Sequence, residues 1–252
     1  MVWLPDRSSF GRHRRVFHFE LMLQKIIGPF REFGPVAGLL YAIDRVLSSF
    51  SPDLHLYVYE LMVQPIMDKP LFPRGFRKQL EIREIKPGDP ELALMPVRSE
   101  AMDARLAQHA TCLGAFQKGV FIGYMWFCNP TYDEDEVRCT YVLGRAKESV
   151  FDFDFYIFPE YRMGLAFVGL WNGANEFLSS RNVRYTFSRL TRFNVASRRA
   201  HQHLGWKVVG RAIFLKARSI EFMLATLFPF VHMSITKRGR VHLTLQPNAL
   251  KV

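Results

Sequence analysis

The sequence lacks the features of several classes of protein. It contains no apolar run of about 20 residues, the length that a membrane-spanning helix needs. The longest apolar stretch, residues 220–233, is interrupted by Glu221, Thr226, Pro229 and His232. The first residues are basic, but neither a clean apolar core nor a small-residue cleavage site follows them, as it would in a signal peptide. We therefore expect neither a spanning helix nor a secretion signal.

Cysteine is also scarce. Cys112, Cys128 and Cys139 show neither the even count of a disulfide framework nor the CxxC spacing of a metal site. Isolated cysteines of this kind are typical of a reducing compartment, so we expect a cytoplasmic protein with buried, free thiols and no bound metal. The chain also contains no internal repeat and no low-complexity tract.

Aromatic and basic residues, in contrast, are plentiful. The 252 residues include 23 Phe, 9 Tyr and 4 Trp, and 49% of positions are hydrophobic, which excludes a disordered chain. Lys and Arg number 34 against 23 Asp and Glu, so the formal net charge is +11. Such a protein needs an anionic partner, and nucleic acid, a phosphorylated cofactor and a lipid headgroup layer are the candidates. Nucleic acid is the least favoured, because the basic residues are scattered and no recognition motif accompanies them.

We expect residues 1–76 to form an N-terminal amphipathic helical extension that ends in a connector. Between residues 36 and 50 the apolar positions recur at helical spacing and form one stripe. A strand-like segment follows at 54–63, and the Pro- and Gly-containing stretch 65–75 is the expected connector. With the Arg-rich beginning, the stripe fits an interfacial helix on an anionic membrane, and the alternative is packing on the rest of the chain. The stripe consists of Val36, Leu39, Leu40, Ile43, Val46, Leu47 and Phe50.

We expect residues 77–218 to form a mixed region of strands and helices, and residues 219–252 to form an apolar and basic C-terminal segment. Within the mixed region, the acidic stretch 131–138 is expected to be a solvated loop. The other elements expected there are strands at 80–85, 184–190 and 207–215, a hairpin at 112–127, and helical segments at 91–111, 164–180 and 196–204.

The most regular strand pattern lies at residues 151–158. Side chains alternate across a strand, so this pattern predicts one apolar face and one polar face. The apolar face would carry Phe151, Phe153, Phe155 and Ile157, and the polar face Asp152, Asp154 and Tyr156.

The turn after this strand has features of an anion-binding site. In PEYRMGLAF, residues 159–167, Pro159 ends the strand and a helix is expected from about Gly164. Backbone N–H groups at a helix start lack partners within the helix, and the helix dipole favours an anion beside them. Gly164 and Ala166 are small enough to let an anion approach the backbone, and Arg162 adds positive charge. An ordinary strand-to-helix turn is the alternative interpretation.

A second motif lies about thirty residues further along the chain. In NVASRRAHQHLGW, residues 194–206, Asn194 stands at an expected helix start, and Leu-Gly-Trp leads into the next strand. Together the two motifs resemble the GNAT superfamily of acyl-CoA-dependent N-acyltransferases, over roughly residues 80–215. The resemblance implies an α/β (α+β) fold with a mixed, mostly antiparallel central sheet flanked by helices, preceded here by the helical extension.

The resemblance also implies where an acyl-CoA donor would bind. The turn would hold the pyrophosphate, the strand backbone would pair with the pantetheine arm, and Asn194 would contact that arm, with Arg198 and Arg199 as further cations. The family usually has Arg or Gln where Tyr161 stands, so the side chain that meets the phosphates is left open. The implied donor-binding residues are Tyr156, Ile157, Phe158, Arg162, Met163, Gly164, Leu165, Ala166 and Asn194.

The implied chemistry is attack of an amine on a thioester carbonyl, which needs a base for the ammonium and an acid for the thiolate. In the family a carboxylate on the central strand can be the base, so Asp152 and Asp154 are the candidates, and their mutual repulsion would raise one pKa. The family commonly has a tyrosine that acts as the general acid four residues before the glycine of its second motif. At that position, four residues before Gly205, this chain has His201. The alternatives are solvent-facing or ion-paired aspartates and a surface histidine.

The acceptor is left open between two classes of amine. The many Phe and Met residues and the apolar segments favour a long-chain acyl group and a lipid-like amine. In this mixture the chain resembles the bacterial ceramide synthase type, which N-acylates a sphingoid base, and it would lie peripherally on the inner face of the membrane. The alternatives are an acetyltransferase for a small polar amine or a protein lysine, and a non-catalytic binding or peripheral membrane module with the same fold.

Overall fold

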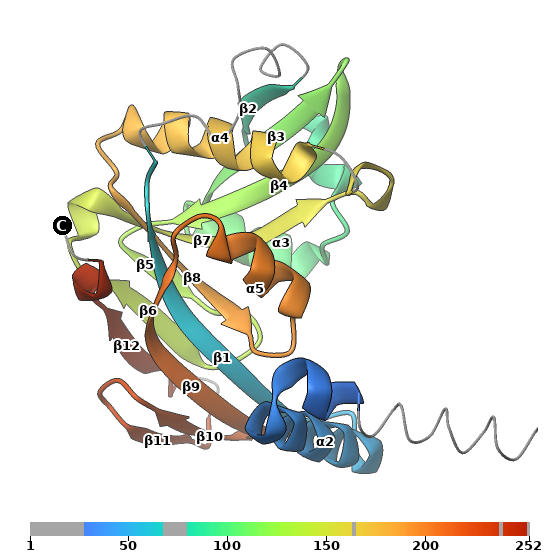
Figure 1. The fold of residues 1–252 in the computed structure, drawn as a ribbon, viewed down its shortest axis with the longest axis vertical. Coiled ribbons are helices and arrows are strands. Elements are labelled where there is room, and N and C mark those ends of the chain that lie inside the picture. Colours follow the sequence, from blue (N-terminus) through green and yellow to red (C-terminus); the bar gives the residue numbers. More distant parts are fainter. Residues whose placement is uncertain (1–27, 68–79, 163–164, 237–238, 251–252) are drawn as a thin grey trace, which may run out of the picture.

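The computed structural model describes residues 28–67, 80–162, 165–236 and 239–250. Its centre is a nine-stranded sheet in the order β11-β10-β9-β1-β8-β7-β4-β3-β2 (Figure 1). The strands of this sheet are β1 (Leu54–Pro65), β2 (Glu81–Ile85), β3 (Thr111–Gln117), β4 (Val120–Cys128), β7 (Ser149–Ile157), β8 (Tyr185–Thr191), β9 (Lys207–Ala217), β10 (Ile220–Ala225) and β11 (Val231–Ser234). All neighbouring strands in it are antiparallel except β7 and β8, which run parallel.

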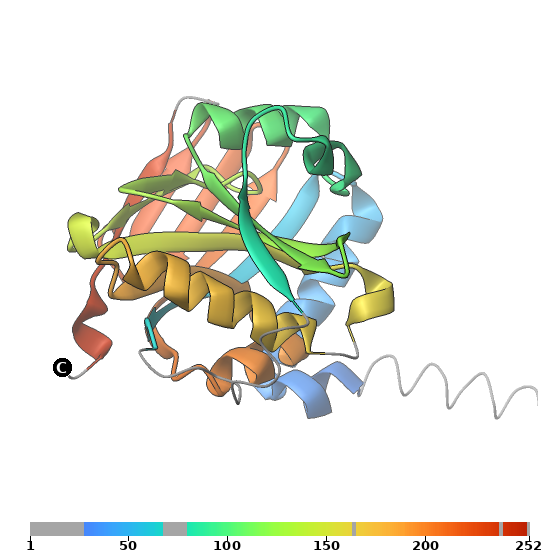
Figure 2. The same cartoon turned by 90° about the horizontal axis from the view of Figure 1, so that it is seen from above.

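Helices and a smaller sheet cover the two faces of the large sheet (Figure 2). On one face lie α4 (Ala166–Ser179) and α5 (Val195–Gln202). On the other lie α3 (Ser99–Ala107) and a three-stranded sheet of β12 (Val241–Leu245), β6 (Cys139–Leu143) and β5 (Thr131–Asp133). At one end, α2 (Pro35–Phe50) packs against β1. This arrangement confirms the predicted mixed, mostly antiparallel sheet, its flanking helices and the N-terminal helical segment.

Strands from all three predicted regions contribute to the large sheet. β1, from the first predicted region, lies between β8 and β9 and pairs with both of them. The C-terminal segment contributes β10 and β11 to the edge of the same sheet, and β12 to the small sheet. The division at residues 76 and 218 stays a prediction, but the sheet joins all three parts.

The core consists mainly of aromatic and branched side chains on both sides of the large sheet. Tyr59, Phe151 and Phe187 are buried against the small sheet, and Trp171 of α4 is buried on the opposite side. No helix within the described ranges is long and apolar enough to span a bilayer.

Two local predictions differ from the structure. The helical segment expected at 91–111 divides into a 3-10 turn, Pro90–Leu94, and α3, because Pro96 has no N–H to donate and restricts the residue before it. The acidic stretch 131–138 is not a solvated loop, since it begins with β5 and the side chains of Tyr132 and Glu134 are buried.

Candidate active site

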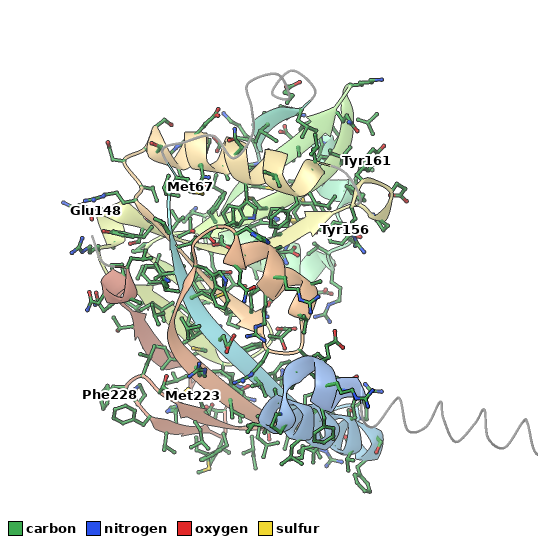
Figure 3. The ribbon with its side chains drawn as sticks, in the orientation of Figure 1. Met67, Glu148, Tyr156, Tyr161, Met223 and Phe228 are labelled. Atoms are coloured by element: carbon green, nitrogen blue, oxygen red, sulfur yellow. The ribbon has the colours of Figure 1, made fainter. Side chains whose placement is uncertain are left out.

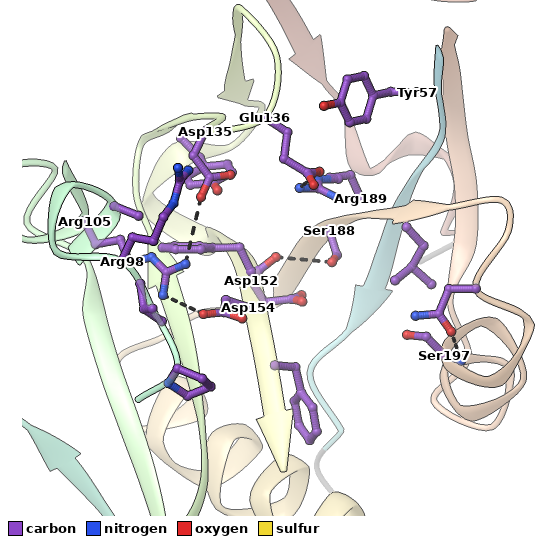
Figure 4. Close-up of a pocket in the computed structure, with 18 of the residues that line it drawn as sticks. Tyr57, Arg98, Arg105, Asp135, Glu136, Asp152, Asp154, Ser188, Arg189 and Ser197 are labelled. Carbon is purple, nitrogen blue, oxygen red and sulfur yellow. Dashed lines mark hydrogen bonds and ion pairs between the residues drawn. The ribbon is translucent and has the colours of Figure 1, made fainter. Parts of the chain in front are cut away.

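The site is opened by the divergence of β7 and β8. The two parallel strands pair only from Ser149 to Phe151 and from Tyr185 to Phe187. Beyond Phe151, the edge of β7 that faces β8 has no strand partner among the residues that the structure describes. A cavity of about 650 Å³ lies where the strands separate (Figure 4). Its lining includes four residues predicted from the sequence, which are Asp152, Asp154, Asn194 and His201.

A bulge in β7 shapes this cavity. Opposite β4, Trp126 pairs with Phe153 and Tyr124 pairs with Tyr156, so β7 has one residue more than β4 between the two pairs. Asp154 lies in the bulge with a φ of 47°, in the left-handed region that aspartate tolerates better than most residues. Because directly paired residues share a face, Phe153 and Tyr156 lie on the same face despite their odd spacing.

The two faces predicted for this strand are therefore wrong beyond the bulge. Asp152 lies on the face covered by α4 and α5, whereas Asp154 forms an ion pair with Arg105 of α3 on the opposite face. Phe155 and Ile157 pack on the α4 side. The two aspartates do not share a polar face.

Asp152 is a buried carboxyl at the wall of the cavity. Asp152 is 3% exposed, and its carboxylate Oδ2 has no hydrogen-bond partner in the described part of the chain. The Ser188 hydroxyl donates to the Asp152 backbone carbonyl at 3.2 Å. Burial raises the pKa of Asp152 to about 7, and the nearby hydroxyls of Ser188 and Thr186 oppose that shift. Desolvation, not the predicted repulsion by Asp154, brings this group into the range of a general base.

Asp154 is held by a buried arginine. Nη1 of Arg105 lies 2.5 Å from the Asp154 carboxylate, and the guanidinium lies over the rings of Trp126 and Phe153. The same guanidinium reaches Asp135 at 3.9 Å. Arg105 thus ties α3 to the bulge, which makes Asp154 an ion-paired acid that also lines the cavity.

Substitutions of Asp154 should separate the ion pair from the backbone conformation. We expect Asp154→Ala to lower the free energy of unfolding by about 3 kcal/mol, roughly 2 from the lost charged hydrogen bond and roughly 1 from alanine at positive φ. Asp154→Gly should lose only the first part, because glycine adopts positive φ freely. Urea unfolding measures both. Equal losses for alanine and glycine would show that the backbone at this bulge carries no strain.

His201 is buried beside the cavity, so the alternative of a surface histidine is wrong. Its Nδ1 lies 2.7 Å from the Ser197 carbonyl oxygen, which can only accept, so Nδ1 carries the proton in the neutral ring. Nε2 is then an acceptor. Burial lowers the pKa of His201, while the bond to Ser197 opposes that shift. The ring also contacts Trp171 edge-on at a centroid distance of 5.7 Å.

The predicted donor-binding residues lie at the end of β7 and the start of α4. Tyr156 and Ile157 pair with β4, and the Phe158 N–H donates to β4 at 3.0 Å, so no described strand pairs with the edge toward β8 at these residues. Arg162 turns back over the Tyr156 ring and donates from Nε to the Ile157 carbonyl at 2.9 Å. Leu165 and Ala166 stand at the first turn of α4. Met163 and Gly164 lie outside the described residues.

Asn194 caps α5 as the sequence predicts. Its Oδ1 accepts from the Ser197 N–H at 3.0 Å, and the residue lines the cavity. Arg198, expected near phosphates, instead lies 3.1 Å from the buried carboxylate of Glu60 on β1. That carboxylate is also approached by Arg192 and Arg211 at 4.0 and 3.5 Å, so the cluster anchors α5 to the sheet.

The acidic residues after β5, which the sequence predicts only as part of a solvated loop, form one wall of the cavity (Figure 4). Glu134 binds Arg189 of β8 through two hydrogen bonds of 2.7 and 2.8 Å. Glu136 accepts from the Tyr59 hydroxyl at 2.7 Å and lies 2.6 Å from the same guanidinium. A charged residue in a buried strand needs a partner of opposite charge. The position of Arg189 in the predicted strand 184–190 could therefore have indicated a buried acidic partner.

Asp135 completes the charged wall. Burial and the neighbouring Glu134 raise the pKa of Asp135 to about 6. The cavity is thus lined by charged side chains of both signs: Arg98, Arg105, Asp135, Glu136, Asp152, Asp154, Arg189 and Lys216. Among the described side chains, no group of His, Cys, Asp and Glu is arranged to hold a metal ion.

No family model matches the chain, and no curated protein matches it. Parts of several solved structures are similar. The GCN5-related glucosamine N-acetyltransferase region of a fungal multi-domain GH3 β-N-acetylglucosaminidase is 16% identical, with a TM-score of 0.42, over 65% of this chain and 21% of that one. A tandem GNAT protein from the clavulanic acid biosynthesis pathway is 15% identical, with a TM-score of 0.44, over 64% and 53%. An aminoglycoside N-acetyltransferase in complex with CoA is 19% identical, with a TM-score of 0.38, over 50% and 91%.

The chain therefore spans about a fifth of the first of these structures and about half of the second. With TM-scores below 0.5, the similarities identify neither an activity nor a substrate for this chain.

Proposed function

We propose that this chain is an acyl-CoA-dependent N-acyltransferase. The observation that carries the proposal is the divergence of β7 and β8. Within the described part of the chain it leaves a strand edge without a strand partner, beside a buried carboxyl whose pKa lies near neutrality. Such an edge suits an extended molecule with amide groups, and the carboxyl suits proton transfer. β7 leads into the first of the two sequence motifs that suggested the family, and Asn194 and His201 of the second motif line the same cavity.

The donor would lie along the free edge of β7. Backbone groups of residues 152–157 on that side can pair with the amides of a pantetheine arm, and the first turn of α4 follows directly. Arg162 contributes its charge from the end of the strand, and Asn194 faces the same cavity from the start of α5. These assignments give roles to the sequence-predicted donor residues that the structure describes.

In the reaction, the amine nitrogen attacks the thioester carbonyl carbon, the C–S bond breaks, and the thiolate takes up the proton that the newly acylated nitrogen loses. The amine must first lose a proton, and Asp152 is the base that we assign to it. His201 enters this scheme as a neutral imidazole whose Nε2 accepts a hydrogen bond. Its lowered pKa disfavours the protonated form that a resting general acid would need, so positioning of the amine is the role we assign.

The lining of the cavity bears on the acceptor. Charged and polar groups together predominate around it, so an amine on a polar head group fits there better than an alkyl chain. This favours the acetyltransferase alternative with a polar amine. A long-chain acyl group and a sphingoid base, the other candidate from the sequence, would have to place only the polar head in this cavity and leave the chains outside it.

Turnover with four substrate pairs tests the proposal. Release of free thiol from acetyl-CoA and from palmitoyl-CoA is measured with a polar diamine and with a long-chain sphingoid base. We expect thiol release with the polar amine, and reduction of that rate by Asp152→Asn in every active pair. Release only with palmitoyl-CoA and the sphingoid base would establish the lipid acceptor instead. No release with any pair, while CoA still binds, would identify a non-catalytic module.

A further inference from the structure

One end of the molecule exposes two apolar faces. The first belongs to α2, where Val36, Leu39, Ile43, Val46 and Phe50 are all exposed, Phe50 to 81%. These residues alternate three and four positions apart, so they form one stripe along the helix. α2 attaches to the protein through other positions: Tyr41 packs on Phe193, and Asp44 accepts from the Leu56 N–H at 2.9 Å. Most of the stripe predicted from the sequence is therefore not used for packing.

The second face belongs to the edge of the large sheet. Leu224 lies opposite Val231, and Phe222 lies opposite both Met233 and Leu215, so these side chains share one face of β9, β10 and β11. Val231 and Met233 are 57% and 60% exposed. The hairpin that joins β10 and β11 adds two exposed aromatic rings, Phe228 and Phe230.

The two faces lie at the same end. Figure 1 shows α2 and the β10–β11 hairpin together there, and Figure 3 shows Phe228 projecting outward from the hairpin. We call them together the apolar surface: Val36, Leu39, Ile43, Val46, Phe50, Leu215, Leu224, Phe228, Phe230, Val231 and Met233. Soluble monomers rarely expose so many large apolar side chains in one region, and such regions mark sites of interaction.

The charges around the apolar surface are mainly positive. Arg31, Arg45, Arg211 and Arg218 are exposed on the helical turn before α2, on α2, and on or after β9, against Glu32 and Asp53. The Arg211 side chain, although 3.5 Å from Glu60, is 56% exposed, and Glu60 is shared by three arginines.

Charge decides between the occupants of the apolar surface. A symmetric dimer through this surface would bring the same arginines face to face, which like-charge repulsion opposes. An anionic bilayer offers negative headgroups to the arginines and an apolar interior to the stripe and the sheet edge.

We propose that the apolar surface binds an anionic lipid membrane, with α2 and the β10–β11 hairpin at the boundary between headgroups and acyl chains. This membrane binding does not depend on acyl transfer, since it uses residues outside the cavity.

Co-sedimentation of the full chain with lipid vesicles tests the proposal. Vesicles of equal parts phosphatidylglycerol and phosphatidylcholine should bind the protein at low salt, and pure phosphatidylcholine should bind it at least tenfold more weakly, with binding to the mixed vesicles falling as salt rises. The double variants Val46→Ser/Phe50→Ser and Val231→Thr/Met233→Thr should each weaken binding by about tenfold or more, because each removes apolar contact. The matched control, Leu94→Ser/Val120→Ser, changes exposed apolar residues outside the apolar surface and should bind as the wild type does.

Thermal unfolding of each variant verifies that it is folded. Two results overturn the proposal: the wild type fails to bind the anionic vesicles at low salt, or both apolar double variants bind as tightly as the control. A wild-type dimer that the apolar variants convert to monomers, without vesicle binding by any of them, would assign the apolar surface to a second copy. Because binding is read without substrates, loss of turnover and loss of membrane binding are separate results.

Discussion

Asp152→Asn is expected to lower turnover by at least about a hundredfold and at the same time to stabilise the protein. General-base catalysis contributes roughly 10²–10⁴ to rate, and an amide cannot accept a proton. The stabilisation follows from burial: the carboxyl is 3% exposed and its pKa is raised to about 7, so its ionised form is disfavoured in the folded state. A base tuned by desolvation costs stability wherever it is charged.

The sign of the pH dependence follows from the raised pKa. The folded protein holds the Asp152 proton up to about pH 7, while an unfolded chain releases it near pH 4, so ionisation makes the wild type less stable as pH rises between these values. The advantage of Asp152→Asn should be absent below about pH 4 and reach roughly 2–4 kcal/mol above pH 7. Wild-type turnover should rise through the same pH 7 region as the base ionises.

Urea unfolding at several pH values and thiol release under the same conditions measure both effects. Asp103→Asn is the matched control, because Asp103 is an exposed acid on α3 outside the cavity. Asp103→Asn should change the free energy of unfolding by no more than about 0.5 kcal/mol, and the turnover rate by no more than the equivalent factor. A stability gain that does not vary with pH, or unchanged turnover in Asp152→Asn, would contradict the assignment of this carboxyl as the base.

Features with a local cause could be predicted from the sequence. The hairpin of β3 and β4 follows from two apolar runs and one glycine turn, and α5 begins at Asn194 because its side chain caps the helix. The order of strands and helices around the two motifs follows in the same way. These features depend on neighbours within a few residues, which the sequence displays directly.

The remaining features depend on partners far apart in sequence. The pattern of alternation continues through β7 without a break, so nothing in it reveals the extra residue at Asp154, which only the pairing with β4 makes visible. The burial of Glu134 depends on Arg189, 55 residues away. The stripe on α2 has the spacing of a packed helix, although most of it is exposed.

Breaking the Glu134–Arg189 pair is expected to be the most destabilising single change in the site. Glu134→Ala leaves the Arg189 guanidinium with Glu136 as its remaining acidic partner, and removal of one partner from a buried pair costs about 3–5 kcal/mol. Burial alone would raise the pKa of Glu134, but the charge and hydrogen bonds of Arg189 outweigh it, so the pKa is lowered. The carboxylate therefore stabilises the fold above its unfolded pKa, and this contribution is lost as pH falls below about 4.5.

The loss in free energy of unfolding should be larger for the single variant Glu134→Ala than for a double variant that removes both charges. Glu134→Leu with Arg189→Met replaces the buried charges with apolar groups, so it should recover part of the stability that Glu134→Ala loses. The control is Glu148→Gln, whose partners Arg145 and Arg184 lie on the surface at 3.8 and 4.0 Å, and it should change stability by less than about 1 kcal/mol. A loss below about 1 kcal/mol for Glu134→Ala would contradict a structural role for the pair. The double variant also tests function, because Asp135 and Glu136, which line the cavity, are the neighbours of Glu134 in the sequence. If the double variant recovers stability but not turnover on polar amines, the charged residues of this loop contribute to acceptor binding as well as to the fold.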